Sequence, residues 1–260
     1  MNFANEDHLL LIQKITDEID ALGLESFMPS IQRHVEKTKT IQKPLDLATL
    51  IEHTLLKPEA TRRDIIRLCE EAKRFHFCGV CVNPVFVKES QKQLAVTDCS
   101  VITVVGFPLG ANVTDTKVEE TKLVIEMGAN EVDMVISLGA LKDGDYKTVY
   151  EEIRAVVEAA GQVPVKVIIE AGLLEETEKI AACVLAERAG AVFVKTSTGF
   201  SVRGAMVEDV KLMRTVVGNK IGIKAAGGIR NFQTASALVE AGATRLGCSA
   251  SVAIVTESLQ

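Results

Sequence analysis

From residue 44 onward, short apolar runs alternate with longer stretches in which apolar residues recur every three or four positions. Short apolar runs are typical of buried strands, and the three-to-four spacing is typical of helices with one buried face. The runs lie at 51–56, 79–84, 101–107, 131–137, 165–171, 192–197, 221–226 and 244–249. An alternation of this kind predicts parallel strands joined by helices, which is the α/β class.

The helical stretches between the runs carry recognisable start and stop signals. Thr61 can cap a helix over 61–75, and glycines follow the helical stretches that end near 128, 161, 190 and 242. Eight such units predict a (β/α)8 TIM barrel. The main alternative is a doubly wound open sheet, which usually carries a glycine-rich nucleotide loop after its first strand. The sequence contains neither G-x-G-x-x-G nor G-x-x-x-x-G-K-[ST].

Residues 1–43 follow a different pattern, which predicts an N-terminal helical extension ahead of a barrel over 44–260. A first helix is indicated by apolar residues at helical spacing, with Gly23 as its stop: Leu9, Leu10, Ile12, Ile15, Ile19 and Leu22. A second helix is expected from Ser26 to Lys37, followed by a linker. These residues carry no evident chemistry, and a packing or oligomerisation arm is the expected role.

Composition narrows the class of protein. The 260 residues are 47% hydrophobic and 25% charged, and the formal net charge is −6 without a basic block. These values indicate a globular enzyme and argue against a nucleic-acid surface. No apolar run reaches the roughly 20 residues of a membrane span, and the N-terminus lacks the features of a signal peptide. We therefore expect a cytoplasmic protein with no membrane partner, in which the six cysteines are reduced.

Polar residues interrupt the predicted strands or follow them directly. In a barrel of this kind, catalytic groups lie at the C-terminal ends of the strands. The candidates are His53, Thr54, Asn83, Asp133, Lys166, Glu170, Lys195, Lys224 and Ser249.

Lys195 and Lys224 occupy equivalent depths on neighbouring strands and form the most informative pair. Two ammonium groups close together repel each other, and partial burial adds to the effect, so one of the two pKa values should fall. Lowering a lysine pKa from about 10.4 to about 7 raises the neutral amine population about 10³-fold. A neutral amine attacks carbonyl carbons and forms a Schiff base, whose iminium withdraws electrons from an adjacent carbon–carbon bond.

Asp133 lies two strands away from Lys195 and has two possible roles. It can transfer a proton, through a water molecule, or it can form an ion pair that sets the protonation of the lysines. The two roles are compatible. The alternative for each lysine is an ordinary buried ion pair, for example between Lys195 and Asp133 or Glu170.

A phosphate site is predicted in the loops that follow the last three strands. Gly199, Gly227 and Gly228 would let backbone amides approach an anion, and Ser249 adds a hydroxyl. This part of a barrel is a frequent phosphate site. The alternative is that the glycines serve only tight turns.

Cys78 and Cys81 form a C-x-x-C motif that enters a strand, so the two side chains point to opposite faces. No second ligand pair accompanies the motif. We therefore expect neither a metal site nor a redox site there.

Eight motifs then appear in one order: IEHTLLKPEAT, CVNPVFV, TVVGFPLG, EVDMVIS, KVIIEAG, VKTSTGF, KAAGGIR and RLGCSAS. Over about residues 44–256 the chain closely resembles the deoxyribose-phosphate aldolases, which are class I aldolases on a (β/α)8 barrel. The resemblance implies reversible cleavage of 2-deoxy-D-ribose 5-phosphate to acetaldehyde and D-glyceraldehyde 3-phosphate, without a metal or other cofactor. It also implies a homodimer and a role in deoxyribonucleotide catabolism.

The resemblance assigns a role to each matched position. Lys195 corresponds to the Schiff-base lysine, Lys224 to the neighbour that depresses its pKa, and Asp133 to the proton relay. Thr54 and Cys81 correspond to positions that line the substrate pocket. Lys166 and Glu170 are expected to orient the network, and the phosphate loops correspond to four residues: Gly199, Gly227, Gly228 and Ser249.

Three positions depart from the pattern of the family. Glu52 stands where aspartate is common, Ala250 stands where some members have a second serine, and the chain ends without the terminal tyrosine of some members. Two alternative functions remain open at this point. One is another Schiff-base sugar-phosphate aldolase, and the other is a non-catalytic sugar-phosphate sensor on the same barrel.

Overall fold

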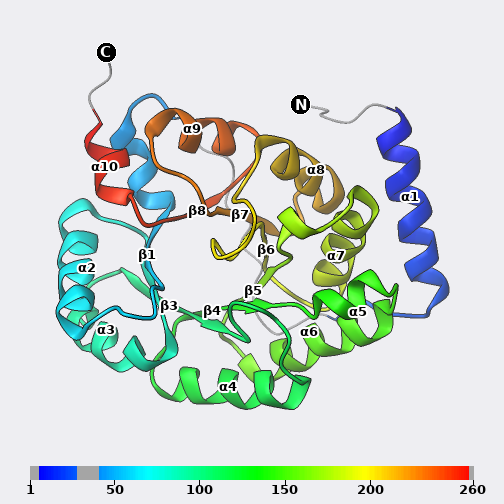
Figure 1. Ribbon diagram of the computed structural model, residues 1–260, viewed down its shortest axis with the longest axis horizontal. Helices are drawn as coiled ribbons and strands as arrows, with labels where there is room; N and C mark the ends of the chain where they lie inside the picture. Colours follow the sequence, from blue (N-terminus) through cyan, green and yellow to red (C-terminus); the bar gives the residue numbers. More distant parts are fainter. Residues whose placement is uncertain (1–5, 28–40, 258–260) are drawn as a thin grey trace.

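The computed structural model describes residues 6–27 and 41–257. Eight parallel strands close into a barrel in the order of the sequence, and β1 pairs with β8 (Figure 1). Their bounds are β1 Ile51–Leu55, β2 Gly79–Val82, β3 Ser100–Val105, β4 Glu131–Val135, β5 Val165–Ile168, β6 Phe193–Lys195, β7 Gly222–Ala226 and β8 Arg245–Cys248. The predicted (β/α)8 barrel is confirmed.

Helices surround the barrel as an outer ring (Figure 1). They are α2 Arg62–Phe75, α3 Val87–Leu94, α4 Thr114–Glu126, α5 Leu138–Lys142, α6 Tyr146–Ala160, α7 Glu176–Arg188, α8 Val207–Val217, α9 Phe232–Glu240 and α10 Ser251–Thr256. Short 3-10 helices add η1 Pro44–Leu50, η2 Pro84–Phe86 and η3 Ala171–Leu173. The buried faces of the helices and the outward side chains of the strands form one continuous apolar core.

Helix α2 shows how local sequence sets an element. The Thr61 hydroxyl accepts from the Asp64 amide, and the Asp64 carboxylate accepts from the Thr61 amide, so the first turn is capped on both sides. The buried face consists of Ile65, Leu68, Cys69 and Ala72. The helix therefore begins at the predicted cap and packs with the predicted face.

Strand register brings the charged residues to one level inside the barrel. Lys195 pairs with Lys224 across β6 and β7, and Asp133 pairs with Lys166 across β4 and β5. Because side chains alternate between the two faces of a strand, Glu52 also points into the barrel, two residues before Thr54. The barrel interior therefore collects charges from strands that are far apart in the sequence.

Helix α1 Glu6–Ala21 lies outside the ring of helices and packs on α7 (Figure 1). Its buried residues are Ile15 and Ile19, in agreement with the predicted spacing. The segment after α1 continues along the same side, where the Phe27 amide donates to the Arg188 carbonyl at 2.6 Å and the Tyr150 hydroxyl donates to the Glu25 carbonyl at 2.7 Å.

The second predicted helix, Ser26–Lys37, is not confirmed at its start. Ser26 and Phe27 are not helical, because Phe27 bonds to the end of α7 instead, and the remainder lies outside the described residues. Among the helices of the described segments, none has the length and apolar character needed to cross a bilayer.

Candidate active site

Asp133 accepts hydrogen bonds from three lysines inside the barrel. The Nζ atoms of Lys195 and Lys224 lie 2.8 and 2.6 Å from its Oδ2, and Lys166 Nζ lies 3.0 Å from its Oδ1. The aspartate is completely buried, as are Lys166 and Lys224. The structure thus brings together the lysine pair and the carboxylate that the sequence singled out, with Lys166 as a third cation.

A second set of charges lies directly behind these groups. Glu52 accepts from Lys224 and lies 3.4 Å from Lys166 and 3.3 Å from Arg245. Glu131 pairs with Lys166 and lies 3.5 Å from Arg245. Glu131 and Arg245 were not predicted, and Glu52 was noted only as a departure. The signal that could have found them is the two-residue period of inward positions along β1, β4 and β8.

The pKa values follow from burial and from these neighbours. Burial alone would raise the pKa of Asp133, but the adjacent lysine charges outweigh it and hold the pKa well below its ordinary value. Burial alone would lower the pKa of Lys224, but the carboxylates of Asp133 and Glu52 hold it well above its ordinary value. The carboxylates likewise raise the pKa of Lys166 against the effect of burial. Lys224 and Lys166 are therefore fixed cations.

The network of described residues contains four potential cations and three carboxylates. The cations are Lys166, Lys195, Lys224 and Arg245, and the carboxylates are Glu52, Glu131 and Asp133. Each of the three carboxylates lies within ion-pair distance of more than one of these cations.

Lys195 is the lysine of this network that reaches a cavity. The cavity has a volume of about 340 Å³, and Lys195 lines it together with residues of the β1, β6, β7 and β8 loops. Lys166 and Lys224 do not line it. An amine at the floor of a cavity can meet a carbonyl carbon, whereas the two fully buried ammonium groups cannot.

The predicted glycine loops also line this cavity. Gly199, Gly227 and Gly228 all line it and have φ values of 86°, 85° and 75°, which favour glycine. The loops after β6 and β7 touch each other, because a Cβ added to Gly204 would lie 2.1 Å from the Gly227 carbonyl oxygen. Ser249 completes the lining from the end of β8.

Glu170 supports the loop after β6. Its carboxylate accepts from the Thr198 hydroxyl and from the Thr198 amide, the latter at 3.1 Å. Glu170 is itself buried, has a left-handed backbone with φ of 51°, and does not line the cavity. It therefore holds the Thr198–Gly199 segment in place.

Thr54 and Cys81 lie at different depths. Thr54 lines the cavity, and its hydroxyl donates to the Glu52 carbonyl at 2.9 Å. Cys81 is completely buried in a small apolar cluster within the barrel, and burial raises the pKa of its thiol to about 11. Cys78 donates its thiol to the Ile51 carbonyl at 3.0 Å.

Comparison with known proteins identifies this arrangement. Residues 40–254 match the profile described as DeoC/LacD family aldolase. The chain belongs to this family of aldolases. The family is the one to which the lysine motifs pointed, and the closed barrel agrees with it.

Two relatives named deoxyribose-phosphate aldolase illustrate the extent of the match within the family. The protein of Bacillus cytotoxicus is 56% identical over 212 residues, covering 81% of this chain and 95% of its own. The protein of Aciduliprofundum boonei is 58% identical over 212 residues, covering 81% of this chain and 96% of its own.

Two solved structures of related proteins have the same fold as this chain. A deoxyribose-phosphate aldolase candidate from Coccidioides immitis matches with a TM-score of 0.83 and 38% identity, covering 99% of both chains. The deoxyribose phosphate aldolase of Aeropyrum pernix, described as a tetramer, matches with a TM-score of 0.76 and 33% identity, covering 82% of this chain and 91% of its own.

Donor atoms that could hold a metal ion meet at one place in the described structure. Glu52, Cys81 and Asp133 bring their donor atoms within 4.8 Å of one another. Both carboxylates already accept hydrogen bonds from the Lys224 ammonium. The ammonium therefore occupies the position from which a cation would neutralise them.

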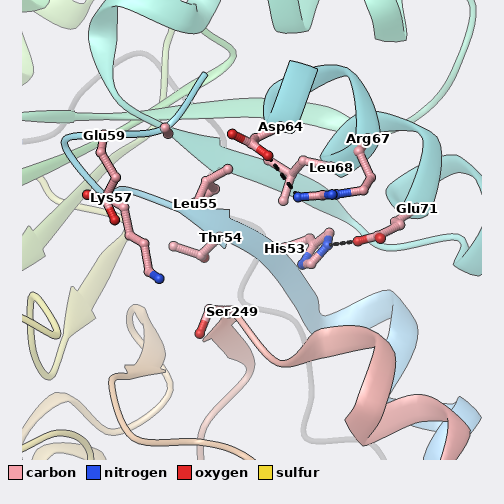
Figure 2. Close-up of a pocket in the computed structure, with 11 residues that line it drawn as sticks. His53, Thr54, Leu55, Lys57, Glu59, Asp64, Arg67, Leu68, Glu71 and Ser249 are labelled. Atoms are coloured by element: carbon pink, nitrogen blue, oxygen red, sulfur yellow. Dashed lines mark hydrogen bonds and ion pairs between the residues drawn. The ribbon is translucent and has the colours of Figure 1, made fainter. Parts of the chain in front are cut away.

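A second cavity adjoins the first on the outer side of β1 (Figure 2). Its volume is about 480 Å³, and it shares Thr54, Leu55, Lys57 and Ser249 with the first. His53 lies at its back, with Nε2 2.7 Å from Glu71 and Nδ1 3.0 Å from Ser251. Both ring nitrogens of His53 are thus engaged, and burial lowers the pKa of this histidine.

Proposed function

We propose that this aldolase cleaves 2-deoxy-D-ribose 5-phosphate reversibly to acetaldehyde and D-glyceraldehyde 3-phosphate, with Lys195 as the Schiff-base residue. The observation that carries the proposal is the position of Lys195. Of the three lysines bound to Asp133, it alone lines the cavity that also holds the glycine loops and Ser249. One cavity thus offers an amine for the carbonyl carbon and glycine loops for the phosphate of one small substrate.

The reaction begins with attack of the neutral Lys195 amine on the aldehyde carbon of the open-chain sugar. Loss of water from the resulting carbinolamine gives the iminium. Lys224 and Lys195 donate to the same atom, Asp133 Oδ2, at 2.6 and 2.8 Å. The positive charge of Lys224 therefore lies beside the Lys195 amine and favours its neutral form.

Bond cleavage needs a proton to leave the hydroxyl on the third carbon. We assign its removal to Asp133 and Lys224 acting through a water molecule. The bond between the second and third carbons then breaks, and its electron pair moves toward the iminium nitrogen. Glyceraldehyde 3-phosphate leaves, the remaining enamine takes a proton on carbon, and hydrolysis releases acetaldehyde and the free amine.

The remaining predicted residues take supporting roles in this proposal. Gly199, Gly227, Gly228 and Ser249 bind the phosphate, and Thr54 contacts the substrate from β1. Glu170 holds the phosphate loop through Thr198. Lys166 and Cys81 lie behind the reacting groups, where Lys166 sets the orientation of Asp133 and Cys81 fills space beside Lys224. The reaction as written uses no metal or organic cofactor.

We also propose a homodimer in the cytoplasm that acts in deoxyribonucleotide catabolism, with residues 44–260 as the catalytic barrel and residues 1–43 as an extension. Six free cysteines suit a reducing compartment. Light scattering on the purified protein measures the oligomeric state directly, and the tetramer described for the Aeropyrum pernix relative is the main alternative outcome.

Borohydride trapping tests the nucleophile. The protein is mixed with 2-deoxyribose 5-phosphate and sodium borohydride, digested, and mapped by mass spectrometry, with Lys195→Gln as the matched control. A reduced two-carbon or five-carbon adduct on Lys195 is expected, together with acetaldehyde release before reduction. An adduct on Lys224 would reverse the two lysine roles. Absence of any adduct on folded protein would exclude the Schiff-base mechanism and favour a sugar-phosphate sensor.

A further inference from the structure

Two cations besides Lys195 line the cavity that holds the glycine loops. They are Lys57, in the loop after β1, and Arg230, in the loop after β7, and both are exposed. Neither has a carboxylate within ion-pair distance among residues 6–27 and 41–257. Two unpaired positive charges thus face the cavity from different sides.

Lys57 lies at the junction of the two cavities. It lines both of them, together with Thr54 and Ser249. Figure 2 shows its side chain leaving the loop after β1, with the ammonium on the side of Thr54 and Ser249. Pro58 follows, and a residue before proline favours an extended backbone over a helical one.

The residues of the loop after β6 that line the cavity carry no charge. Phe200 is 50% exposed and packs edge-on against Phe107, with ring centroids 5.4 Å apart. The residue after Ser249 is Ala250, which supplies no hydroxyl. A phosphate group carries a charge of about −1.5 to −2 at pH 7. Without a cation, only backbone amides and one hydroxyl would bind it.

We propose that Lys57 is a further substrate-binding residue, whose ammonium pairs with the phosphate group held by Ser249 and the glycine loops. The proposal rests on the proposed function. An ammonium on a flexible four-carbon stem follows a small anion as a point charge. Lys57 approaches the phosphate from the β1 side while Arg230 covers the β7 side. Lys57 therefore discriminates phosphorylated from unphosphorylated substrates and takes no part in carbon–carbon cleavage.

The test compares Lys57→Met and Lys57→Arg with the unchanged protein on two substrates, 2-deoxyribose 5-phosphate and 2-deoxyribose. Lys57→Met should lower kcat/KM for the phosphorylated sugar about tenfold, mainly through KM, because one charge-assisted contact is lost. The value for 2-deoxyribose should stay within about twofold, because that contact is absent from it. Lys57→Arg should restore most of the loss. Lys88→Met, an exposed lysine on α3 that lines neither cavity, serves as the control for losing one surface charge.

Competitive inhibition by inorganic phosphate gives a second measurement, made with 2-deoxyribose as substrate. The inhibition constant should rise about tenfold in Lys57→Met and stay unchanged in Lys88→Met. An equal fall in kcat/KM for both sugars, or an unchanged phosphate constant, would overturn the proposal. If the unchanged protein fails to cleave 2-deoxyribose 5-phosphate, the proposed function fails. Calorimetric titration of phosphate into the unchanged protein and Lys57→Met then still decides the role of Lys57.

Discussion

Lys195 and Lys224 are register partners on β6 and β7 and donate to the same carboxylate oxygen of Asp133. Their nitrogens can be no farther apart than two hydrogen bonds placed end to end. The carboxylates hold Lys224 as a cation, so Lys195 always has a positive neighbour. In the proposed mechanism this relationship separates the roles of the two lysines: Lys224 keeps its charge, and Lys195 reacts.

Replacing Lys224 by methionine should remove that positive neighbour. Asp133 then stabilises an ammonium on Lys195, and the neutral amine becomes scarcer at pH 7. We expect kcat/KM to fall about 10²-fold or more at pH 7, and the rate to recover as the pH is raised. A pH–rate profile from pH 6 to 10 measures the effect. Lys224→Arg keeps the positive charge, so the rise of rate with pH should occur near the same pH as in the unchanged protein. A loss of rate in Lys224→Met that is equal at every pH would contradict the proposed effect of Lys224 on Lys195.

Replacing Asp133 by asparagine should change both activity and the dependence of stability on acid. The pKa of Asp133 in the folded protein lies well below its value in the unfolded chain. Its contribution to stability is therefore fully present above about pH 3.9, the unfolded pKa, and is lost as the pH falls through the folded pKa. We expect Asp133→Asn to lower the free energy of unfolding by about 3–5 kcal/mol at pH 7, because three buried lysines lose their shared partner.

Urea unfolding at pH 7 and at pH 3 measures both effects. The difference in free energy between the unchanged protein and Asp133→Asn should be smaller at pH 3 than at pH 7. Lys142→Met, which removes an exposed ion pair with Glu178, is the control and should change the free energy of unfolding by less than about 1 kcal/mol. A constant difference across this pH range would contradict the assignment of the low pKa to Asp133.

Gly204→Ala should weaken phosphate binding and leave Schiff-base formation intact. The added Cβ would lie 2.1 Å from the Gly227 carbonyl oxygen, so the loops after β6 and β7 must separate. We expect KM for 2-deoxyribose 5-phosphate to rise about tenfold or more, since a displacement of this size misplaces the bound group. Borohydride trapping with acetaldehyde should still modify Lys195. Gly139→Ala on α5, where nothing lies within 4 Å of the new Cβ, should leave KM unchanged.

Ile19→Ala should loosen α1 without affecting catalysis. Ile19 is completely buried where α1 packs on α7. Removing its side-chain atoms leaves a space that neighbouring side chains can fill only in part, so we expect the packing of α1 to weaken by about 2 kcal/mol. Hydrogen exchange of the α1 amides should accelerate, while kcat/KM stays within about twofold. Lys14→Ala, on the exposed side of α1, should change neither quantity. A fall in kcat/KM with Ile19→Ala would show that the extension influences the site.

The strands, their parallel order and the adjacency of Lys195 and Lys224 could be predicted from the sequence, because these features depend on local pattern and nearest-neighbour register. Glu131, Arg245 and the inward position of Glu52 could not. They meet their partners only when β1 closes on β8, and contacts across a closed barrel depend on its tilt and stagger. The cations that these carboxylates share therefore become visible only in three dimensions.

The burial of Lys117 on α4 could not be predicted from the helical pattern of the sequence either. Lys117 on α4 is completely buried and donates to Glu152 on α6 at 2.5 Å and to the carbonyls of Gly110 and Val135 at 2.8 Å each. In a helix with few apolar residues, such a lysine reads as part of a solvated face. The ends of the helices were easier to predict from the sequence, because glycine at a helix end has a local conformational cause.

Glu52 holds two partners that are synthesised long after it. Lys224 follows it by 172 positions and Arg245 by 193. A ribosome must therefore deliver nearly the whole chain before the first strand finds the cations that neutralise it, because β7 and β8 are the last strands to emerge. In the proposed mechanism the reactive amine therefore forms only at the end of biosynthesis, and an incomplete nascent chain presents no activated lysine to the aldehydes of the cell.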